Sequence, residues 1–327
     1  MKWFSTIVAF IAIQAVVASP ARLLKRASPD ETASVGYAAG TTGGSGGTTI
    51  NVSSLSELED AVSGDEKRIV IVNGAISGDA VVRIGSNKSV LGAPGASLTG
   101  IGLRVLDVSN VIIRNLKISK VLAPGDNIGI QSASNVWVDH VELSSDLDHD
   151  KLLCLTHERC GVKSTIPSYD GLLDVTHGCT GVTVSNSYLH DHYKASLVGH
   201  SDSNQSEDVA IRVTYVGNYW KNLNSRTPSF RFGTGHIYNN YFESNNDGIN
   251  TRVGAQLLVE NNVWVSPKKP LYSTGEGYAV ARGNDFGGGE NTAPAGSFSS
   301  APYSYGLLDT SQVVSSVTSQ AGATLSW

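Results

Sequence analysis

The chain has 327 residues, of which 24 are basic and 29 acidic, giving a formal net charge of −5 at pH 7. This acidic balance argues against nucleic acid as a partner, because binding to phosphate backbones depends on Lys and Arg. A polyanionic polysaccharide would also be repelled by the average field, so an enzyme acting on one needs a local cluster of cations.

The N-terminal segment has the pattern of a secretory signal peptide, with the basic residue Lys2 followed by an apolar run over residues 3–17. This run is shorter than the roughly 20 residues that a membrane-spanning helix needs, and no later segment approaches that length, so we expect no membrane association. We predict a signal peptide at 1–18, a propeptide at 19–26 with a dibasic end, and one secreted, extracellular domain at 27–327. Removal of residues 1–26 leaves 20 basic against 29 acidic residues, a net charge of −9.

Cysteines and glycosylation sequons fit an extracellular protein. Three cysteines are an odd set in an oxidising compartment. We favour a local bridge between Cys154 and Cys160, with Cys179 as a buried, inert thiol. We expect glycosylation on exposed turns at the three sequons, Asn51, Asn87 and Asn204.

Short β-branched segments recur along the chain, and the last four repeats are 22 residues apart. Aligning the segments places seven polar residues at one equivalent position: Asn115, His140, Asn186, Asn218, Asn240, Asn262 and Asn284. A fixed period of this size, with strands and turns but no helical pattern, is typical of a solenoid that gains one strand spacing per coil. We therefore predict an all-β fold, a right-handed, single-stranded parallel β-helix with a structural ladder of stacked asparagines. His140 is interpreted as a rung of that ladder.

Other features concern the ends and one widened coil. The segment 54–57 has a capping-box pattern that predicts a short N-terminal helix covering the first coil. Beyond Gly289 the repeat is lost, which indicates a tail folded back over the solenoid. One coil carries an insertion of roughly twenty residues, and inserted loops on a solenoid commonly build its binding surface. We expect an active site near residues 145–174.

Three segments hold the polar residues that could carry chemistry. SYDGLLD contains Asp170 and Asp174, APGDNIG contains Asp126, and SRTPSFRFG contains Arg226 and Arg231. Taken alone, these side chains would be read as solvated surface charges.

Four motifs together are more specific. They resemble those of the pectate lyases of polysaccharide lyase family 1, particularly the fungal secreted members, and the similarity extends from about Gly43 to Phe286. The motifs are NKSVLG at 87–92, WVDH at 137–140, YDGLLDVTHG at 169–178 and RTPSFRFGTGH at 226–236.

The resemblance implies that Asp126, Asp170 and Asp174 bind Ca²⁺. Some family members have a further Asp where this chain has Pro124, so fewer protein ligands remain here. Calcium takes 6–8 oxygen ligands, which leaves positions for water and for the substrate carboxylate. An ideal strand would separate Asp170 from Asp174 by about 13 Å. We therefore expect a bend, which Gly171 permits.

The resemblance also implies a reaction. Arg226 matches the catalytic arginine, and Lys194 and Arg231 match residues that hold the uronate. The implied activity is calcium-dependent β-elimination on α-1,4-linked polygalacturonate, which is de-esterified pectin, giving 4,5-unsaturated oligogalacturonides. Asp139 is expected to brace the site through hydrogen bonds, whereas Trp137 is expected to pack.

Three other functions are compatible with a secreted β-helix but fit this sequence less well. A pectin lyase would act on methyl-esterified pectin without calcium, but this chain keeps the carboxylates, and its five Trp, one of them in the signal segment, supply an aromatic cleft poorly. A polygalacturonase would need paired carboxylic acids, and no adjacent Asp–Asp pair is present. A non-catalytic binding protein is disfavoured because all five matched residues, from Asp126 to Arg226, are retained. We expect a monomer.

Overall fold

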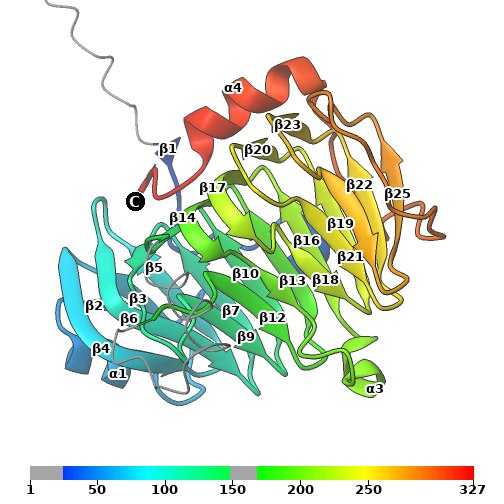
Figure 1. Cartoon of the computed structure of the whole chain (residues 1–327). Coiled ribbons are helices and arrows are strands. Elements are labelled where there is room, and N and C mark those ends of the chain that lie inside the picture. The colour runs from blue at the N-terminus through cyan, green and yellow to red at the C-terminus, as the bar shows by residue number, and fades with distance from the viewer. Residues whose placement is uncertain (1–24, 148–167) are drawn as a thin grey trace, which may run out of the picture.

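The computed structural model describes residues 25–147 and 168–327, and its strands stack in parallel into one solenoid (Figure 1). This arrangement confirms the predicted parallel β-helix. The predicted signal peptide, Cys154 and Cys160 lie outside the described residues. No helix in the described part of the chain is both long and apolar enough to cross a membrane.

One side of the solenoid is a ten-stranded parallel sheet that receives one strand from each coil. From β16 onward its in-register partners, Arg212, Thr234, Gln256 and Tyr278, reproduce the 22-residue period. The strands are β2 (Thr48–Val52), β3 (Arg68–Val72), β5 (Lys88–Gly92), β7 (Ser109–Arg114), β10 (Ser134–Asp139), β13 (Thr180–Ser185), β16 (Arg212–Val216), β19 (Thr234–Tyr238), β22 (Gln256–Glu260) and β25 (Tyr278–Arg282).

Two further faces complete each coil. The site face, so named here, contains β9 (Ile128–Gln131), β12 (Leu173–Thr176), β15 (Leu197–Val198), β18 (Ser229–Arg231), β21 (Ile249–Arg252) and β24 (Leu271–Thr274). The third face contains β8 (Lys117–Ser119), β11 (Glu142–Ser144), β14 (Tyr188–Lys194), β17 (Tyr219–Ser225), β20 (Tyr241–Glu243) and β23 (Val263–Val265). In the first coils the long strands β4 (Ala75–Ile84) and β6 (Ser97–Leu106) run through both faces; the start of β6 pairs with β8 and its end with β9.

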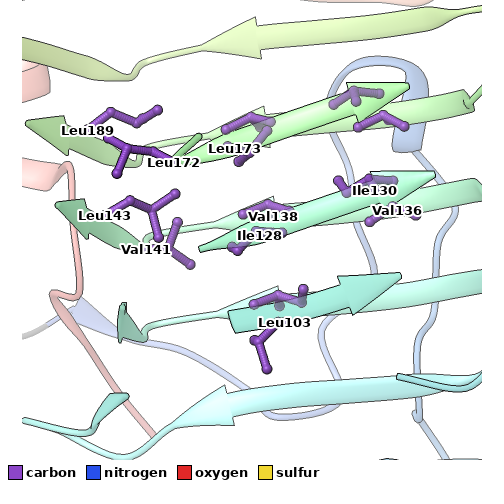
Figure 2. Packing of buried hydrophobic residues seen from close by; sticks show 14 of the residues in the cluster. Leu103, Ile128, Ile130, Val136, Val138, Val141, Leu143, Leu172, Leu173 and Leu189 are labelled. Carbon is purple, nitrogen blue, oxygen red and sulfur yellow. The ribbon is translucent and has the colours of Figure 1, made fainter. Parts of the chain in front are cut away.

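The core fills the inside of the coils with stacked aliphatic side chains. Figure 2 shows Leu103, Ile128, Ile130 and Leu173 of the site face meeting Val136 and Val138 of the ten-stranded sheet. Because successive strand residues point to opposite faces, the residues between these core positions project outward. This alternation decides which polar side chains of the site face can reach a substrate.

An asparagine ladder lies at one turn of the last coils. The backbone N–H and Nδ2 of Asn218 donate to Oδ1 of Asn240 at 2.9 and 3.0 Å, and the same pair of bonds joins Asn240 to Asn262 and Asn262 to Asn284. This part of the prediction is confirmed.

In the lower coils, the residues predicted as rungs of the ladder lie one position before the true ladder position. The ladder continues to Ser187, whose N–H donates to Asn218 Oδ1 at 2.9 Å. Asn115, His140 and Asn186 occupy the preceding turn position, with φ of 58°, 51° and 45°. That position is left-handed, and Asn tolerates this conformation better than most residues, so both neighbouring positions favour the same residue type.

Both ends of the solenoid are covered. At the first coil α1 (Leu55–Val62) begins at Ser54, whose side chain accepts from the N–H of Glu57 at 3.3 Å, and Glu57 Oε2 accepts in return from Ser53 N–H. At the last coil the tail pairs with β25, where Ala279 N–H donates to the carbonyl of Pro294. The predicted capping helix and returning tail are both present.

The tail then runs back along the solenoid. α4 (Thr310–Gln320) packs Val313 and Val317 against Tyr241 and Val263 of the third face, and β26 (Leu325–Ser326) pairs with β1 (Lys25–Arg26). Short helices are η1 (Gly36–Ala38) and α3 (Gln205–Asp208).

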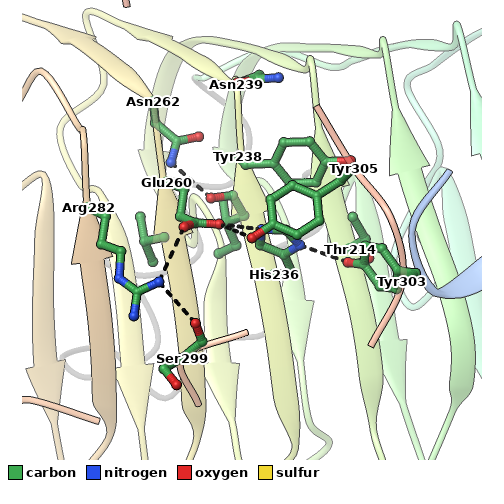
Figure 3. A network of polar contacts seen from close by, with 12 residues as sticks. Thr214, His236, Tyr238, Asn239, Glu260, Asn262, Arg282, Ser299, Tyr303 and Tyr305 are labelled. Carbon is green, nitrogen blue, oxygen red and sulfur yellow. Dashed lines mark hydrogen bonds and ion pairs between the residues drawn. The ribbon is translucent and has the colours of Figure 1, made fainter. Parts of the chain in front are cut away.

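A buried polar network docks the tail on the ten-stranded sheet (Figure 3). The Tyr303 hydroxyl lies 2.7 Å from Thr214 Oγ1 and 2.8 Å from His236 Nδ1. Glu260 Oε2 accepts from the Tyr305 hydroxyl at 2.8 Å and lies 3.1 Å from His236 Nε2. The tail is thus tied to the sheet by directed hydrogen bonds between buried groups.

Candidate active site

The site face brings together residues from four successive coils. Asp126 precedes β9, Asp174 lies within β12, Lys194 ends β14 just before β15, and Arg226 lies between β17 and β18. Asp174 is in register with Gly129 of β9, so its side chain projects outward between the core residues of its own strand.

Two carboxylates share one small space beside Gly171. The N–H of Gly171 donates to Asp126 Oδ1 at 2.9 Å, and the N–H of Leu197 donates to Asp174 Oδ1 at 2.8 Å. A Cβ atom on Gly171 would lie 2.6 Å from Asp174 Oδ1 and 2.9 Å from Asp126 Oδ1. Gly171 is therefore needed for the room that it leaves to the two carboxylates. Its φ is not left-handed, so the expected reason for a glycine here, a special bend, was incomplete.

Ionisation of both carboxylates is unfavourable, because the two groups are buried and close to each other. Burial, together with the charges of Asp174 and Asp170, raises the pKa of Asp126 to about 8. Burial raises the pKa of Asp174 to about 6, although Arg226 and the Leu197 N–H act to lower it. Such a pair favours a proton or a cation between its members.

Asp170 stands beside this pair. Its Oδ1 lies 3.4 Å from Lys194 Nζ, while its charge acts on both Asp126 and Asp174. Within residues 25–147 and 168–327, no three Asp, Glu, His or Cys side chains are arranged so that together they could hold one metal ion. The structure therefore brings two of the three predicted ligands together and places the third next to them.

The donor set fits a hard cation. Asp126 and Asp174 offer oxygens, and calcium is bound by carboxylate and carbonyl oxygens with several positions left to water. Burial raises the pKa of both carboxylates, and the charge of Asp170 adds to the rise, so a bound cation would favour their ionised forms.

Positive charge gathers on the C-terminal side of the carboxylates. Arg231 Nε binds Asp202 and its NH1 group donates to the carbonyl of Gly199 at 3.3 Å, while Arg252 NH2 donates to both oxygens of Asp202 at 3.2 Å. Burial lowers the pKa of Arg252, and the positive charges of Arg231 and Arg226 lower it further. Sequence analysis missed Asp202 and Arg252. Arg252 is in register with Arg231 but only 21 residues after it, so a strict 22-residue period points to the next residue instead.

Arg226 is held by its backbone. Its φ is 62°, and its carbonyl accepts from the N–H of Ser196 at 2.8 Å. The same left-handed conformation recurs at turns of the solenoid, for example at Asn115 and Asn239, so it shows that Arg226 occupies a tight turn between β17 and β18.

Asp139 does not brace this site, contrary to the expectation. It lies on β10 of the ten-stranded sheet, where it accepts from Arg114 Nε at 2.9 Å and Ser185 Oγ at 2.7 Å, and lies 2.7 Å from His140 Nδ1. Burial alone would raise the pKa of Asp139, but His140 and Arg114 hold it well below its usual range. Trp137 packs in this cluster as expected, with its Nε1 donating to Ser185.

The remaining predicted positions lie away from the site. Cys179 is buried with a free thiol, and burial raises its pKa to about 12, which agrees with the expected inert thiol. Asn51 is exposed on β2, while the side-chain amides of Asn87 and Asn204 are hydrogen bonded within the protein.

Comparisons with known proteins give the family of the chain. A family model described as pectate lyase matches residues 6–326. The chain belongs to the pectate lyase family. It is 57% identical to pectate lyase A of Emericella nidulans over 93% of this chain and 90% of that protein, and 54% identical to a probable pectate lyase A of Aspergillus fumigatus over 99% of both.

Solved structures of pectate lyases share the fold. A pectate lyase from Bacillus sp. N165, solved in complex with trigalacturonate, superposes with a TM-score of 0.74 at 30% identity, covering 89% of this chain and 99% of that one. Pectate lyase II from Xanthomonas campestris gives a TM-score of 0.75 at 29% identity over 88% of this chain and 98% of that one. The protein is thus a polysaccharide lyase of this family.

Proposed function

We propose that this protein is a secreted, extracellular pectate lyase that cleaves α-1,4-linked polygalacturonate by calcium-dependent β-elimination and releases 4,5-unsaturated oligogalacturonides. The observation that carries the proposal is the shared space of Asp126 and Asp174 beside Gly171, with Lys194 and Arg226 on the next coils. The trigalacturonate complex of the Bacillus relative supports the substrate class.

Calcium would be held by Asp126, Asp174 and the neighbouring Asp170. When bound there, the ion would supply positive charge that stabilises the negative charge developing on the uronate as the C5 proton leaves. The protein contributes a rigid cradle, because Gly171 and Leu197 fix one oxygen of Asp126 and of Asp174 through backbone N–H groups.

Arg226 is the proposed base. In its neutral form it takes the C5 proton, the C5–H electron pair forms the C4–C5 double bond, and the C4–O bond breaks. The leaving oxygen then takes a proton from water, and the hydroxide that remains takes the proton back from Arg226. Lys194 and Arg231 bind uronate carboxylates and hold the chain in place. Asp202 orients Arg231 and Arg252 together, so that both present their guanidinium groups along one edge of the site face.

We also propose that the enzyme acts as a glycosylated monomer. α1 and the returning tail cover the two ends of the strand stack, and covered ends protect a solenoid from edge-to-edge association.

The test is an assay on polygalacturonate that follows the ultraviolet absorbance of the unsaturated product. We expect chelator to abolish the product and Arg226→Lys to lower kcat by at least about 1000-fold. Arg282→Lys, a conservative change at an exposed arginine of β25, is the matched control and should behave as the wild type. Full activity on methyl-esterified pectin in chelator would identify a pectin lyase. New reducing ends without absorbance would identify a hydrolase.

A further inference from the structure

The site face continues toward the N-terminus beyond Asp126. Arg104 of β6 is in register with Gly129 of β9, and Gly129 is in register with Asp174 of β12. Residues in register on parallel strands point to the same side of the sheet, so Arg104 and Asp174 both project outward. Leu103, which precedes Arg104, lies in the core, as the alternation requires (Figure 2).

Only one strand separates Arg104 from Asp174, and it carries a glycine at that position. Two strand spacings amount to about 10 Å. A Cβ atom on Gly129 would lie 3.3 Å from Asp126 Oδ2, so the Asp126 carboxylate occupies the space above the glycine. Arg104 therefore borders the acidic cluster on the side opposite Lys194, and its charge acts on Asp126.

A second arginine extends this row. Arg83 of β4 is in register with Arg104, and it too lies between two core residues, Val82 and Ile84. In the described part of the chain neither arginine has an ion pair, whereas Arg231 on the opposite side is bound to Asp202. Beside Arg104 is a hollow of about 290 Å³, lined by the apolar residues Val81, Val121, Leu122 and Pro124 and also by Asp79.

This arrangement has an electrostatic consequence for a polyanionic chain. The protein is acidic overall, and the three aspartates by themselves would repel a polyuronate. Cations on both sides of the cluster would hold such a chain across it, since a carboxylate beyond the reacting unit meets Arg104, which forms no ion pair within residues 25–147 and 168–327.

We propose that Arg104, with Arg83 on the next strand, forms a distal subsite that binds a carboxylate of the uronate chain on the N-terminal side of the aspartates. The proposal rests on the proposed function, because it assumes a polyuronate substrate lying across the site face. The subsite makes the enzyme favour long chains, whose units reach Arg104, over short ones.

The experiment compares kcat/KM on polygalacturonate and on trigalacturonate for the wild type, Arg104→Gln, Arg104→Lys and the control Lys67→Gln, an exposed lysine on the turn before β3 of the ten-stranded sheet. In Arg104→Gln we expect KM for the polymer to rise about tenfold and the preference for polymer over trimer to shrink by a similar factor. Arg104→Lys should restore most of the preference, and Lys67→Gln should keep all of it. An unchanged preference in Arg104→Gln would overturn the subsite. So would a changed calcium requirement without a changed preference, because Arg104 would then only balance the charge of Asp126.

A binding measurement separates this proposal from the proposed function. Calorimetry with hexagalacturonate in an Arg226→Lys background requires no turnover, and adding Arg104→Gln should weaken binding about tenfold. Equal affinity for hexagalacturonate with and without Arg104→Gln would contradict the subsite, even if the wild type forms unsaturated product. A wild type without product contradicts the elimination, while calorimetry still decides the role of Arg104.

Discussion

The backbone N–H of Gly171 donates to Oδ1 of Asp126 at 2.9 Å, which joins two segments that are 45 residues apart in sequence. The same glycine leaves the room in which Asp174 approaches Asp126. Gly171 thus binds the Asp126 carboxylate through its backbone N–H, and its lack of a side chain leaves space for the Asp174 carboxylate.

Gly171→Ala should therefore disable the site without unfolding the protein. The new methyl group would lie within 3 Å of oxygens of both Asp126 and Asp174, and the carboxylates would have to separate. We expect activity to fall by at least about 100-fold, since the calcium cradle is distorted. The measurement is activity against calcium concentration. Gly306→Ala, where nothing lies within 4 Å of the added carbon, is the control. A normal calcium response in Gly171→Ala would contradict the assignment of this cradle.

The acidic pair should make the metal-free protein sensitive to alkaline pH. Asp126 has a folded pKa raised from 3.8 to about 8, so the folded state holds a proton that the unfolded state has already lost. The free energy of unfolding should fall as pH rises between about 4 and 8, by several kcal/mol.

Thermal unfolding in chelator, followed from pH 4 to 8, tests this expectation. Asp126→Asn removes the titrating group, so its Tm should exceed that of the wild type at pH 8 and approach it at pH 4. Calcium should stabilise the wild type increasingly toward pH 8 and Asp126→Asn much less. Parallel Tm curves for the two proteins in chelator would show that Asp126 does not titrate in this window.

Much of the fold could be predicted because the repeat is local and periodic. Strands β19, β22 and β25 each begin 22 residues after the preceding strand of the sheet, starting from β16, so that one pattern specifies four coils. The ladder register was harder to assign. Asn239 lies in the left-handed turn position and Asn240 beside it in the ladder, so composition alone does not say which of two neighbouring positions stacks.

The site was only partly predictable. Asp126 and Asp174 were found through motifs. Arg104 belongs to the site face through its register with Gly129, and Asp202 through its ion pair with Arg231, and a sequence period reveals neither relation. Asp139 was misplaced for the converse reason. Its motif is family-like, yet strand β10 carries it on the ten-stranded sheet.

The ladder should contribute strongly to stability. Asn240 is buried; its Nδ2 donates to the carbonyls of Tyr215 and Tyr238, and its Oδ1 accepts from Asn218. Asn240→Ala leaves several buried polar groups unsatisfied, so we expect a loss of about 3 kcal/mol or more in the free energy of unfolding. Urea unfolding provides the measurement. Asn246→Ala, at an exposed asparagine whose contacts with Asn224 are 3.3 and 3.4 Å and whose Oδ1 accepts from the exposed Lys268, should cost less than about 1 kcal/mol. Equal losses of unfolding free energy in Asn240→Ala and Asn246→Ala would show that a ladder asparagine contributes no more than an exposed one.

The three sequons should differ in occupancy. Asn51 is exposed, and its Oδ1 accepts from Asn73. In Asn87 the Nδ2 group donates to the Asp65 carbonyl, and in Asn204 it donates to the carboxylates of Glu207 and Asp208. A glycan on Nδ2 would remove one of these donors. Mass spectrometry of peptides from the secreted protein should find a glycan on Asn51, with Asn87 and Asn204 largely unmodified. Full occupancy of Asn87 would contradict this ranking.

Docking of the tail should weaken in acid through His236 (Figure 3). Burial lowers the folded pKa of His236 from 6.5 to about 4, so the ring is neutral in the folded protein. A neutral ring can accept from the Tyr303 hydroxyl at Nδ1 and donate to Glu260 at Nε2. Below pH 6.5 the His236 ring binds a proton in the unfolded chain but stays neutral in the folded protein. Stability is therefore present above that pH and lost as pH falls toward 4, by about 1–3 kcal/mol.

His236→Gln removes this titration while keeping a polar side chain. The variant will be less stable than the wild type at pH 7, because the amide cannot reproduce both contacts. The informative quantity is the slope of Tm between pH 6.5 and 4, measured with saturating calcium so that the aspartate pair does not contribute. We expect a shallower slope in His236→Gln than in the wild type. Tyr278→Phe, at a half-buried position of β25 outside this network, should keep the wild-type slope. Identical slopes in His236→Gln and wild type would mean that His236 is protonated in the folded protein, and the tail would then be held by an ion pair with Glu260.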